Sequence, residues 1–144
     1  MTAALGFGLA LVLTAIAAAH FYWAFGGVWP ARDELGLVNM VIGAKDARSA
    51  PSRRLTIVVA TAIEAAGLVA VLLTAPCTGL CGALVALAGA VLCLIFLMRF
   101  AFGYLPFWRR RFSRQPFARL DRLFYSPLCL AIAMGFAVLV FERQ

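Results

Sequence analysis

The chain has 144 residues, of which 65% are hydrophobic and only 13% are charged, and its formal net charge is +7. The fraction of charged residues is about half of that in a usual soluble domain, which excludes an ordinary soluble globular protein. The basic balance does not indicate nucleic-acid binding, because the Lys and Arg residues gather in two loops in a pattern that membrane topology explains.

Four apolar stretches dominate the sequence, and they cover residues 3–26, 55–75, 82–104 and 123–141. Each is long enough to cross a bilayer, which takes about 20 mostly apolar residues in a helix. The pattern predicts an all-α integral membrane protein in which four transmembrane helices form one bundle. Little chain remains for another module, so we expect a single domain over residues 1–144.

The first connection, Gly27–Arg54, is long and basic, and it contains an apolar segment, Leu35–Ile42, that is too short to span. Such a segment is expected to lie at the membrane interface or against the bundle. In the third connection Phe117, Leu120 and Phe124 recur at helical spacing, which predicts a short interfacial helix before the fourth span. Ser126-Pro127 then predicts a bend into that span.

The Lys and Arg residues of the loops predict the orientation. The first and third loops carry them, whereas the second loop, around Pro76–Cys81, has none. Short loops rich in Lys and Arg stay in the cytoplasm. We therefore expect a multi-pass protein of the bacterial cytoplasmic (inner) membrane, with both basic loops inside and both termini outside.

Three spans each contribute one ionisable side chain, and these are His20, Glu64 and Arg99. At about 1.5 Å per residue they lie roughly 9, 14 and 8 Å from the cytoplasmic ends of their stretches, so they share one layer. Ionisable groups in a bilayer usually face the bundle interior and find a partner. We expect Glu64 to face inward beside Arg99 or His20. Each residue also has an alternative without a ligand. Arg99 can extend its side chain to the lipid headgroups, Glu64 can form a purely structural ion pair, and His20 can be a neutral residue that hydrogen-bonds between helices.

This layer predicts a site in the inner half of the bundle. His20 and Glu64 form a candidate catalytic acid/base pair, since histidine changes charge near neutrality. Trp23 shares a helix face with His20, Arg99 suits an anionic head group, and Tyr125 is a further candidate for binding. The ligand is expected to be a small or lipid-like molecule, and isomerase-type chemistry would use the acid/base pair.

Two alternatives stay open: a small transporter or proton-coupled carrier, and a non-catalytic structural or assembly subunit of a membrane complex. Membrane lipids are the expected surroundings, and a second copy of the chain or another membrane protein is a possible partner. The sequence leaves the cofactor unknown. One histidine and no Cys/His cluster predict no metal site within the chain.

Cys77 and Cys81 are the only close cysteines, and they lie in a loop expected on the oxidising side, where a disulfide is possible. Their spacing is not the C-x-x-C of thiol oxidoreductases, so a structural bond is favoured over a catalytic dithiol. Cys93 and Cys129 lie inside spans and are expected to pack as small apolar residues.

Two fragments resemble a family of small four-helix bacterial membrane proteins known only as a domain of unknown function. The fragments are His20-Phe-Tyr-Trp-Ala-Phe-Gly-Gly27 and Phe117-Ala-Arg-Leu-Asp-Arg-Leu-Phe-Tyr-Ser-Pro-Leu-Cys-Leu130. Arg99-Phe-Ala-Phe-Gly103 is similar to a third feature of that family, an arginine before a glycine at the inner end of a helix. The resemblance covers nearly the whole chain and implies the four-helix plan. It marks as motif positions His20, Trp23, Arg99, Asp121, Tyr125 and Pro127.

Overall fold

The computed structural model of the chain describes residues 2–46 and 49–143, and these residues form helices and loops. Four helical runs are long and apolar enough to cross a membrane. They are α1 (Thr2–Ala24), α3 (Arg53–Leu72), α4 (Gly79–Tyr104) and a run over Phe117–Glu142. The run comprises α6 (Phe117–Leu120), the π-helical turn η1 (Asp121–Tyr125) and α7 (Ser126–Glu142). The prediction of an all-α membrane protein with four spans is confirmed.

Two short helices lie in the basic loops: α2 (Glu34–Val41) and α5 (Pro106–Arg111). Helix α2 begins where the Asp33 carboxylate accepts a hydrogen bond from the Gly36 amide at 2.7 Å, and it contains the apolar segment predicted to lie at the interface. Helix α5 begins with a proline, whose fixed φ suits a first helical turn. No helix was predicted there.

Helix capping explains why the second span begins earlier than the apolar stretch suggests. The Ser52 side chain accepts a hydrogen bond from the Leu55 amide, so α3 begins at Arg53 rather than at residue 55. The helix ends at Leu72 rather than at residue 75. The third span likewise begins three residues earlier than predicted, at Gly79. A prediction that counts only apolar residues leaves out the polar and glycine residues at helix ends, so it places the start of these two helices too far inward.

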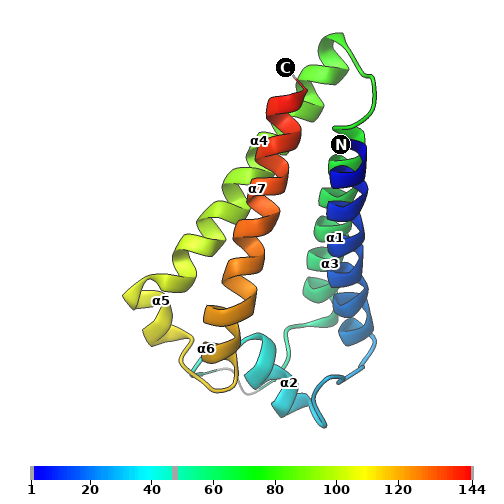
Figure 1. Cartoon of the computed structure of the whole chain (residues 1–144). Coiled ribbons are helices and arrows are strands. Elements are labelled where there is room, and N and C mark those ends of the chain that lie inside the picture. Colours follow the sequence, from blue (N-terminus) through cyan, green and yellow to red (C-terminus); the bar gives the residue numbers. More distant parts are fainter. Residues whose placement is uncertain (1, 47–48, 144) are drawn as a thin grey trace.

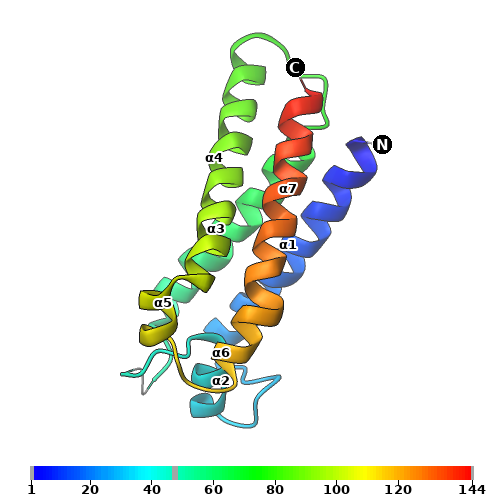
Figure 2. The ribbon, with the colours of Figure 1, turned by 60° about the vertical axis from the view of Figure 1, so that its left-hand side comes forward.

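The long helices are arranged as two antiparallel pairs, α1 with α3 and α4 with α7 (Figures 1 and 2). Contacts within each pair far outnumber those between the pairs. Both termini lie at one end of the bundle, here called the terminal end, and α2, α5 and α6 lie at the other, the arginine-rich end. The pairs diverge toward the arginine-rich end (Figure 1).

The core fills the terminal half of the bundle, where the pairs meet. Its buried residues are Leu9, Leu13, Ala66, Ala70, Leu73, Ile132, Phe136 and Leu139. Helix α4 contributes Phe96, whose ring stacks on that of Phe136 with 6.2 Å between centroids. Small residues let these helices approach closely, and in a membrane such packing is a main source of helix association.

The short helix predicted before the fourth span corresponds to α6, and η1 joins it to α7. The Ser126 amide donates to the carbonyl of Asp121, five residues back, which is the π-helical pattern. Pro127 lacks an N–H and cannot continue the α-helical ladder. A π turn just before this proline changes the register without ending the helix.

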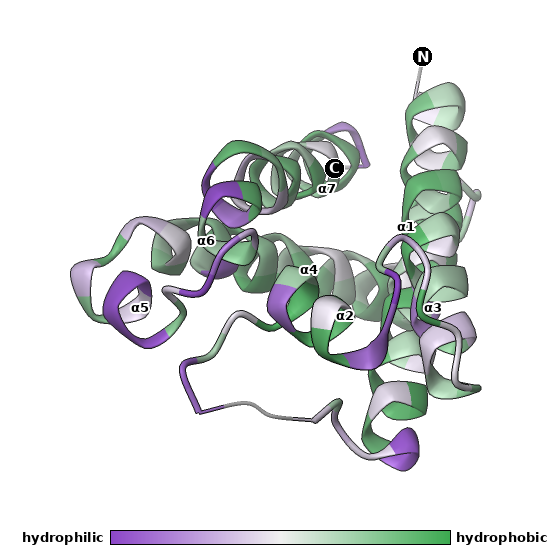
Figure 3. Cartoon of the chain, turned by 90° about the horizontal axis from the view of Figure 1, so that it is seen from below, coloured by the Kyte–Doolittle hydropathy of each residue, from purple (hydrophilic) through white to green (hydrophobic). Residues whose placement is uncertain are grey.

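The two basic loops bind each other at the arginine-rich end. The Arg114 guanidinium donates to the Asn39 side chain at 3.0 Å and to the Lys45 carbonyl at 2.8 Å. The Tyr125 hydroxyl donates to the Met40 carbonyl at 3.3 Å. Seen from this end, α2, α5 and α6 carry hydrophilic segments, whereas the long helices are mostly hydrophobic (Figure 3). The docked loops thus connect the two helix pairs where the pairs themselves have separated.

Candidate functional site

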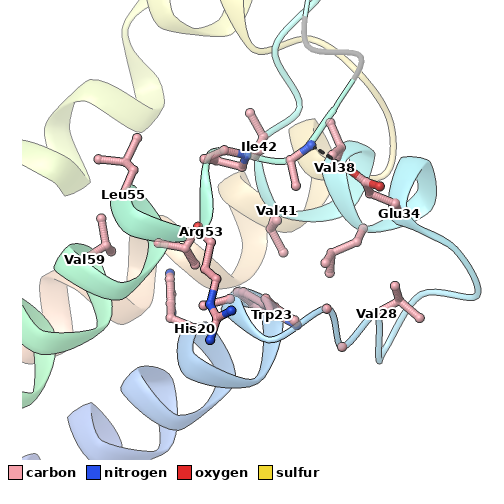
Figure 4. A pocket seen from close by; sticks show the side chains of 17 residues that line it. His20, Trp23, Val28, Glu34, Val38, Val41, Ile42, Arg53, Leu55 and Val59 are labelled. Carbon is pink, nitrogen blue, oxygen red and sulfur yellow. Dashed lines mark hydrogen bonds between the residues drawn. The ribbon is translucent and has the colours of Figure 1, made fainter.

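A cavity of about 450 Å³ lies at the arginine-rich end, between α1, α2 and α3. Its volume is in the range of small-molecule sites, which are commonly concave, mostly apolar and furnished with a few polar groups. Figure 4 shows that the end of α1, the start of α3 and one side of α2 contribute its walls. The polar and charged side chains in the wall come from His20, Trp23, Glu34, Arg53 and Thr56.

The cavity exists because of the way the helix pairs diverge. His20 lies on the same face of α1 as the core residues Leu9 and Leu13, because positions 9, 13 and 20 recur at helical spacing. Val59 lies on the same face of α3 as the core residue Ala66 by the same rule. Yet Val59 is 38% exposed, since α7 no longer covers this level. The interior faces of α1 and α3 therefore line a cavity instead of a core.

The hydrogen bonding of His20 determines which ring nitrogen a ligand can reach. Its Nδ1 lies 2.8 Å from the carbonyl oxygen of Ile16, one turn earlier in α1. A carbonyl oxygen only accepts hydrogen bonds, so Nδ1 carries a proton and the neutral ring has its lone pair on Nε2. In the neutral ring Nε2 can then accept a hydrogen bond or a proton from a molecule in the cavity.

Trp23 forms an aromatic wall beside His20, with 5.0 Å between the ring centroids. Its indole N–H donates to the Trp29 carbonyl at 2.8 Å, which fixes the ring against the loop after α1. The predicted pairing of His20 and Trp23 on one helix face is confirmed, and both side chains line the cavity (Figure 4).

Two charged residues of the cavity were missed because both come from the basic connection. Arg53, at the start of α3, holds its guanidinium 4.4 Å from the centre of the Phe25 ring. Glu34, at the start of α2, accepts a hydrogen bond from the Ala50 amide at 3.0 Å (Figure 4). Arg53 follows a serine cap after a proline, and that capping pattern is the signal that could have placed it on a helix.

Glu64 does not join this site, so the expected inward-facing cluster with His20 and Arg99 is wrong. The side chain of Glu64 is exposed, and one of its oxygens accepts a hydrogen bond from the Thr14 hydroxyl at 3.1 Å. The prediction used depth along the helix, and depth alone does not give the direction of a side chain. Position 64 lies about 160° around the helix from the core residue Ala66, at roughly 100° per residue.

Arg99 pairs with Asp121, a residue that lies outside the four apolar stretches and was therefore not considered as its partner. Its guanidinium donates to the Asp121 carboxylate at 2.5 Å, and this carboxylate is 5% exposed. Trp108 donates its indole N–H to the other oxygen at 3.2 Å, and the Ser126 hydroxyl donates to the first at 3.3 Å. The signal for this pair was the set of family motif positions, which includes both Arg99 and Asp121.

The Arg99–Asp121 network and Tyr125 belong to the α4–α7 side of the bundle and do not line the cavity. The network ties α4 to η1, and the Tyr125 hydroxyl ties η1 to α2. An aromatic series joins Trp108, Phe112, Phe117 and Tyr125, with centroid separations of 4.2, 6.1 and 5.9 Å. These contacts give Arg99 and Tyr125 a role in holding the arginine-rich end together.

At the terminal end Cys77 and Cys81 form a disulfide, the bond that their spacing in the sequence allowed. Next to it the Arg143 guanidinium donates to the carbonyls of Leu72, Leu73, Ala75 and Cys77.

The other two cysteines, Cys93 and Cys129, are free and partly buried. Within residues 2–46 and 49–143, no three His, Cys, Asp or Glu side chains gather as metal ligands.

Comparison with known proteins identifies a family. A family model described as a protein of unknown function, DUF3995, matches residues 13–136, from the middle of α1 to the core of α7. No curated protein and no solved structure matches the chain. The match includes His20, Trp23, Arg99 and Asp121 and takes in most of all four spans. The chain belongs to the DUF3995 family.

Proposed function

We propose that the protein binds a small, lipid-like molecule in the cavity at the arginine-rich end. The observation that carries the proposal is that the interior faces of α1 and α3 there present His20, Trp23 and Val59 to a cavity instead of a packed core. A membrane protein that needed only stability would fill this level with apolar side chains, as it does in the terminal half.

The walls of the cavity favour an amphiphilic ligand. Arg53 supplies a cation for an anionic or polar head group, and His20 Nε2 supplies a hydrogen-bond acceptor. Leu37, Val41 and Val59 supply apolar surface for a chain or ring, and the Trp23 ring can stack on a flat group. A head group near the basic loops with an apolar body toward the bundle matches the orientation of a lipid.

The membrane and the orientation are part of the same proposal. The arginine-rich end would face the cytoplasm of a bacterial cell, in the inner membrane, and both termini and the Cys77–Cys81 disulfide would face outward. The loop charges support this, because Lys and Arg in short loops stay on the cytoplasmic side. An oxidising exterior would also suit the disulfide.

Acid/base chemistry of the isomerase type is a second candidate, favoured by Glu34 lining the same cavity as His20. The carboxyl partner would then be Glu34, since Glu64 is exposed, bonds Thr14 and does not line the cavity. A carrier is less well supported. The packed layer of Leu13, Phe136 and Leu139 lies between the cavity and the terminal end and would have to open.

Native mass spectrometry and lipid analysis of gently purified protein test the proposal. One molecule should copurify in stoichiometric amount with the wild-type chain, and His20→Ala and Arg53→Gln should each reduce its occupancy at least about tenfold, the loss of one charged or well-placed hydrogen bond. Arg54→Gln is the matched control, because Arg54 is the next residue to Arg53, carries the same charge and does not line the cavity. Equal lipid content in all four proteins would favour a structural subunit and refute the site.

A further inference from the structure

The strongest feature outside the cavity is a polar pair on the outer surface of the α1–α3 pair. Glu64 of α3 accepts a hydrogen bond from the Thr14 hydroxyl of α1 at 3.1 Å, and both side chains are exposed. This outer surface faces away from α4 and α7, because Glu64 lies about 160° around α3 from the core residue Ala66 at roughly 100° per residue. In a membrane it would face lipid.

The pair lies near the middle of the two helices. Glu64 is eleven residues after Arg53 in a helix of 20 residues, so it lies about 16 Å along an axis of roughly 30 Å. Thr14 lies at a similar level, about 15 Å from the end of α1 at Ala24. At this depth no water or headgroup is available to a carboxyl group, and ionisable side chains at such positions normally face protein.

The hydrogen bond to Thr14 satisfies only part of the carboxyl group. Thr14 donates to one oxygen, and within the described residues no side chain or backbone group bonds the second. A protonated carboxyl group both donates and accepts hydrogen bonds, so a second carboxyl group is a complementary partner for it. The second oxygen of Glu64 therefore has room for one more hydrogen-bonding partner from outside the described chain.

The side chains on the arginine-rich side of the polar pair are small enough to let another helix pair approach. Ala18 and Thr61 flank the pair there at helical spacing and are exposed. Larger exposed side chains lie one to two turns toward the terminal end, and they are Phe7, Leu11 and Leu68. Membrane helices associate through such small residues because they allow close backbone contact and hydrogen bonds between helices.

We propose that this surface, defined by Thr14, Ala18, Thr61 and Glu64, is the interface of a symmetric homodimer. A two-fold axis beside Glu64 brings the two carboxyl groups together, each hydrogen-bonded to its own Thr14 and to the other carboxyl. Two-fold interfaces use the same patch on both copies, and this patch is complementary to itself. A cationic partner from the described chain does not fit at this level. Arg99 is paired with Asp121. The other arginines of the spans lie within the first turns at the arginine-rich end, and they are Arg53, Arg54, Arg119 and Arg122.

Cysteine crosslinking in membranes tests the geometry in the full chain. With Cys93 and Cys129 replaced by Ala, Thr61→Cys should form a symmetric intermolecular disulfide on mild oxidation. Leu94→Cys is the matched control, because Leu94 is 57% exposed near the middle of α4, away from the proposed axis. Equal crosslinking at both positions, or none at Thr61→Cys, would overturn the interface.

The association strength gives a second, independent readout. By single-molecule subunit counting in lipid vesicles, the wild-type chain should be dimeric, and Glu64→Leu should weaken dimerisation by about tenfold or more, the equivalent of one or two interhelical hydrogen bonds. Glu64→Gln should keep most of the association, since an amide also donates and accepts. Neither variant should change the molecule bound in the cavity. A monomeric wild-type chain, or a dimer unaffected by Glu64→Leu, would refute the proposal.

Discussion

The Arg99–Asp121 pair should show an asymmetric response when each partner is removed. The Asp121 side chain is 5% exposed, whereas that of Arg99 is 29% exposed. Arg99→Met leaves a buried carboxylate that keeps only the Trp108 and Ser126 donors. Asp121→Asn leaves a guanidinium on a long stem that can reach toward the surface.

These environments set the expected magnitudes. Leaving one member of a buried ion pair without its partner costs about 3–5 kcal/mol, so Arg99→Met should lower the free energy of unfolding by roughly that amount. Asp121→Asn keeps the shape of the side chain and one accepting oxygen, which can stay on Arg99 and Ser126, but loses the acceptor for Trp108. It should cost only about 1–2 kcal/mol. The double variant removes both charges, so its loss of stability should be smaller than the sum of the two single losses by about 1–3 kcal/mol, the range of coupling between residues in contact.

Equilibrium unfolding in mixed micelles, followed by tryptophan fluorescence and circular dichroism, would measure all four proteins. Trp108 is a direct probe, because its ring lies 5.0 Å from the Arg99 guanidinium carbon. If the two single effects simply add in the double variant, to within about 0.5 kcal/mol, the pair is not a coupled unit and the reasoning fails.

Three further outcomes follow from the fold. Reporter fusions should give a cytoplasmic signal at Ser49 and an external signal at Gln144, and a periplasmic Ser49 would overturn the orientation. Cys77→Ser should lower stability by up to about 2 kcal/mol, the loop-closure term for so short a loop, without loss of the bound molecule. Gly103→Ala should cost about 1–3 kcal/mol in a thermal unfolding assay, because its new Cβ would collide with α7, whereas Gly8→Ala faces open space and should cost little.

The four spans could be predicted because their length and apolar character depend on the chain alone. The boundary errors came from residues that such a count ignores, such as Ser52 and Gly79. The arrangement of the spans as two pairs was not predicted. It depends on where small residues and side-chain volumes match across helices, as at Gly89, which receives Leu73 and Val140.

The site was predicted in part. His20 and Trp23 line the cavity because they share the interior face of α1. Glu64 was misplaced because depth along a helix was used without its rotation about the axis. Arg99 and Tyr125 were assigned to the ligand, yet they bind Asp121 and Met40, groups that lie in or beside the basic loops. How those loops fold back against each other depends on contacts such as Arg114 with Asn39, which join residues 75 apart in sequence.

The cavity ligand is tested most directly by photo-crosslinking in native membranes. A benzophenone amino acid in place of Val59 lies in the cavity wall, and the same group in place of Leu94 faces lipid. On illumination, the adducts at position 59 should be dominated by one molecular species, and those at position 94 should reflect the bulk lipid composition. Adducts of bulk composition at both positions would contradict a specific ligand site.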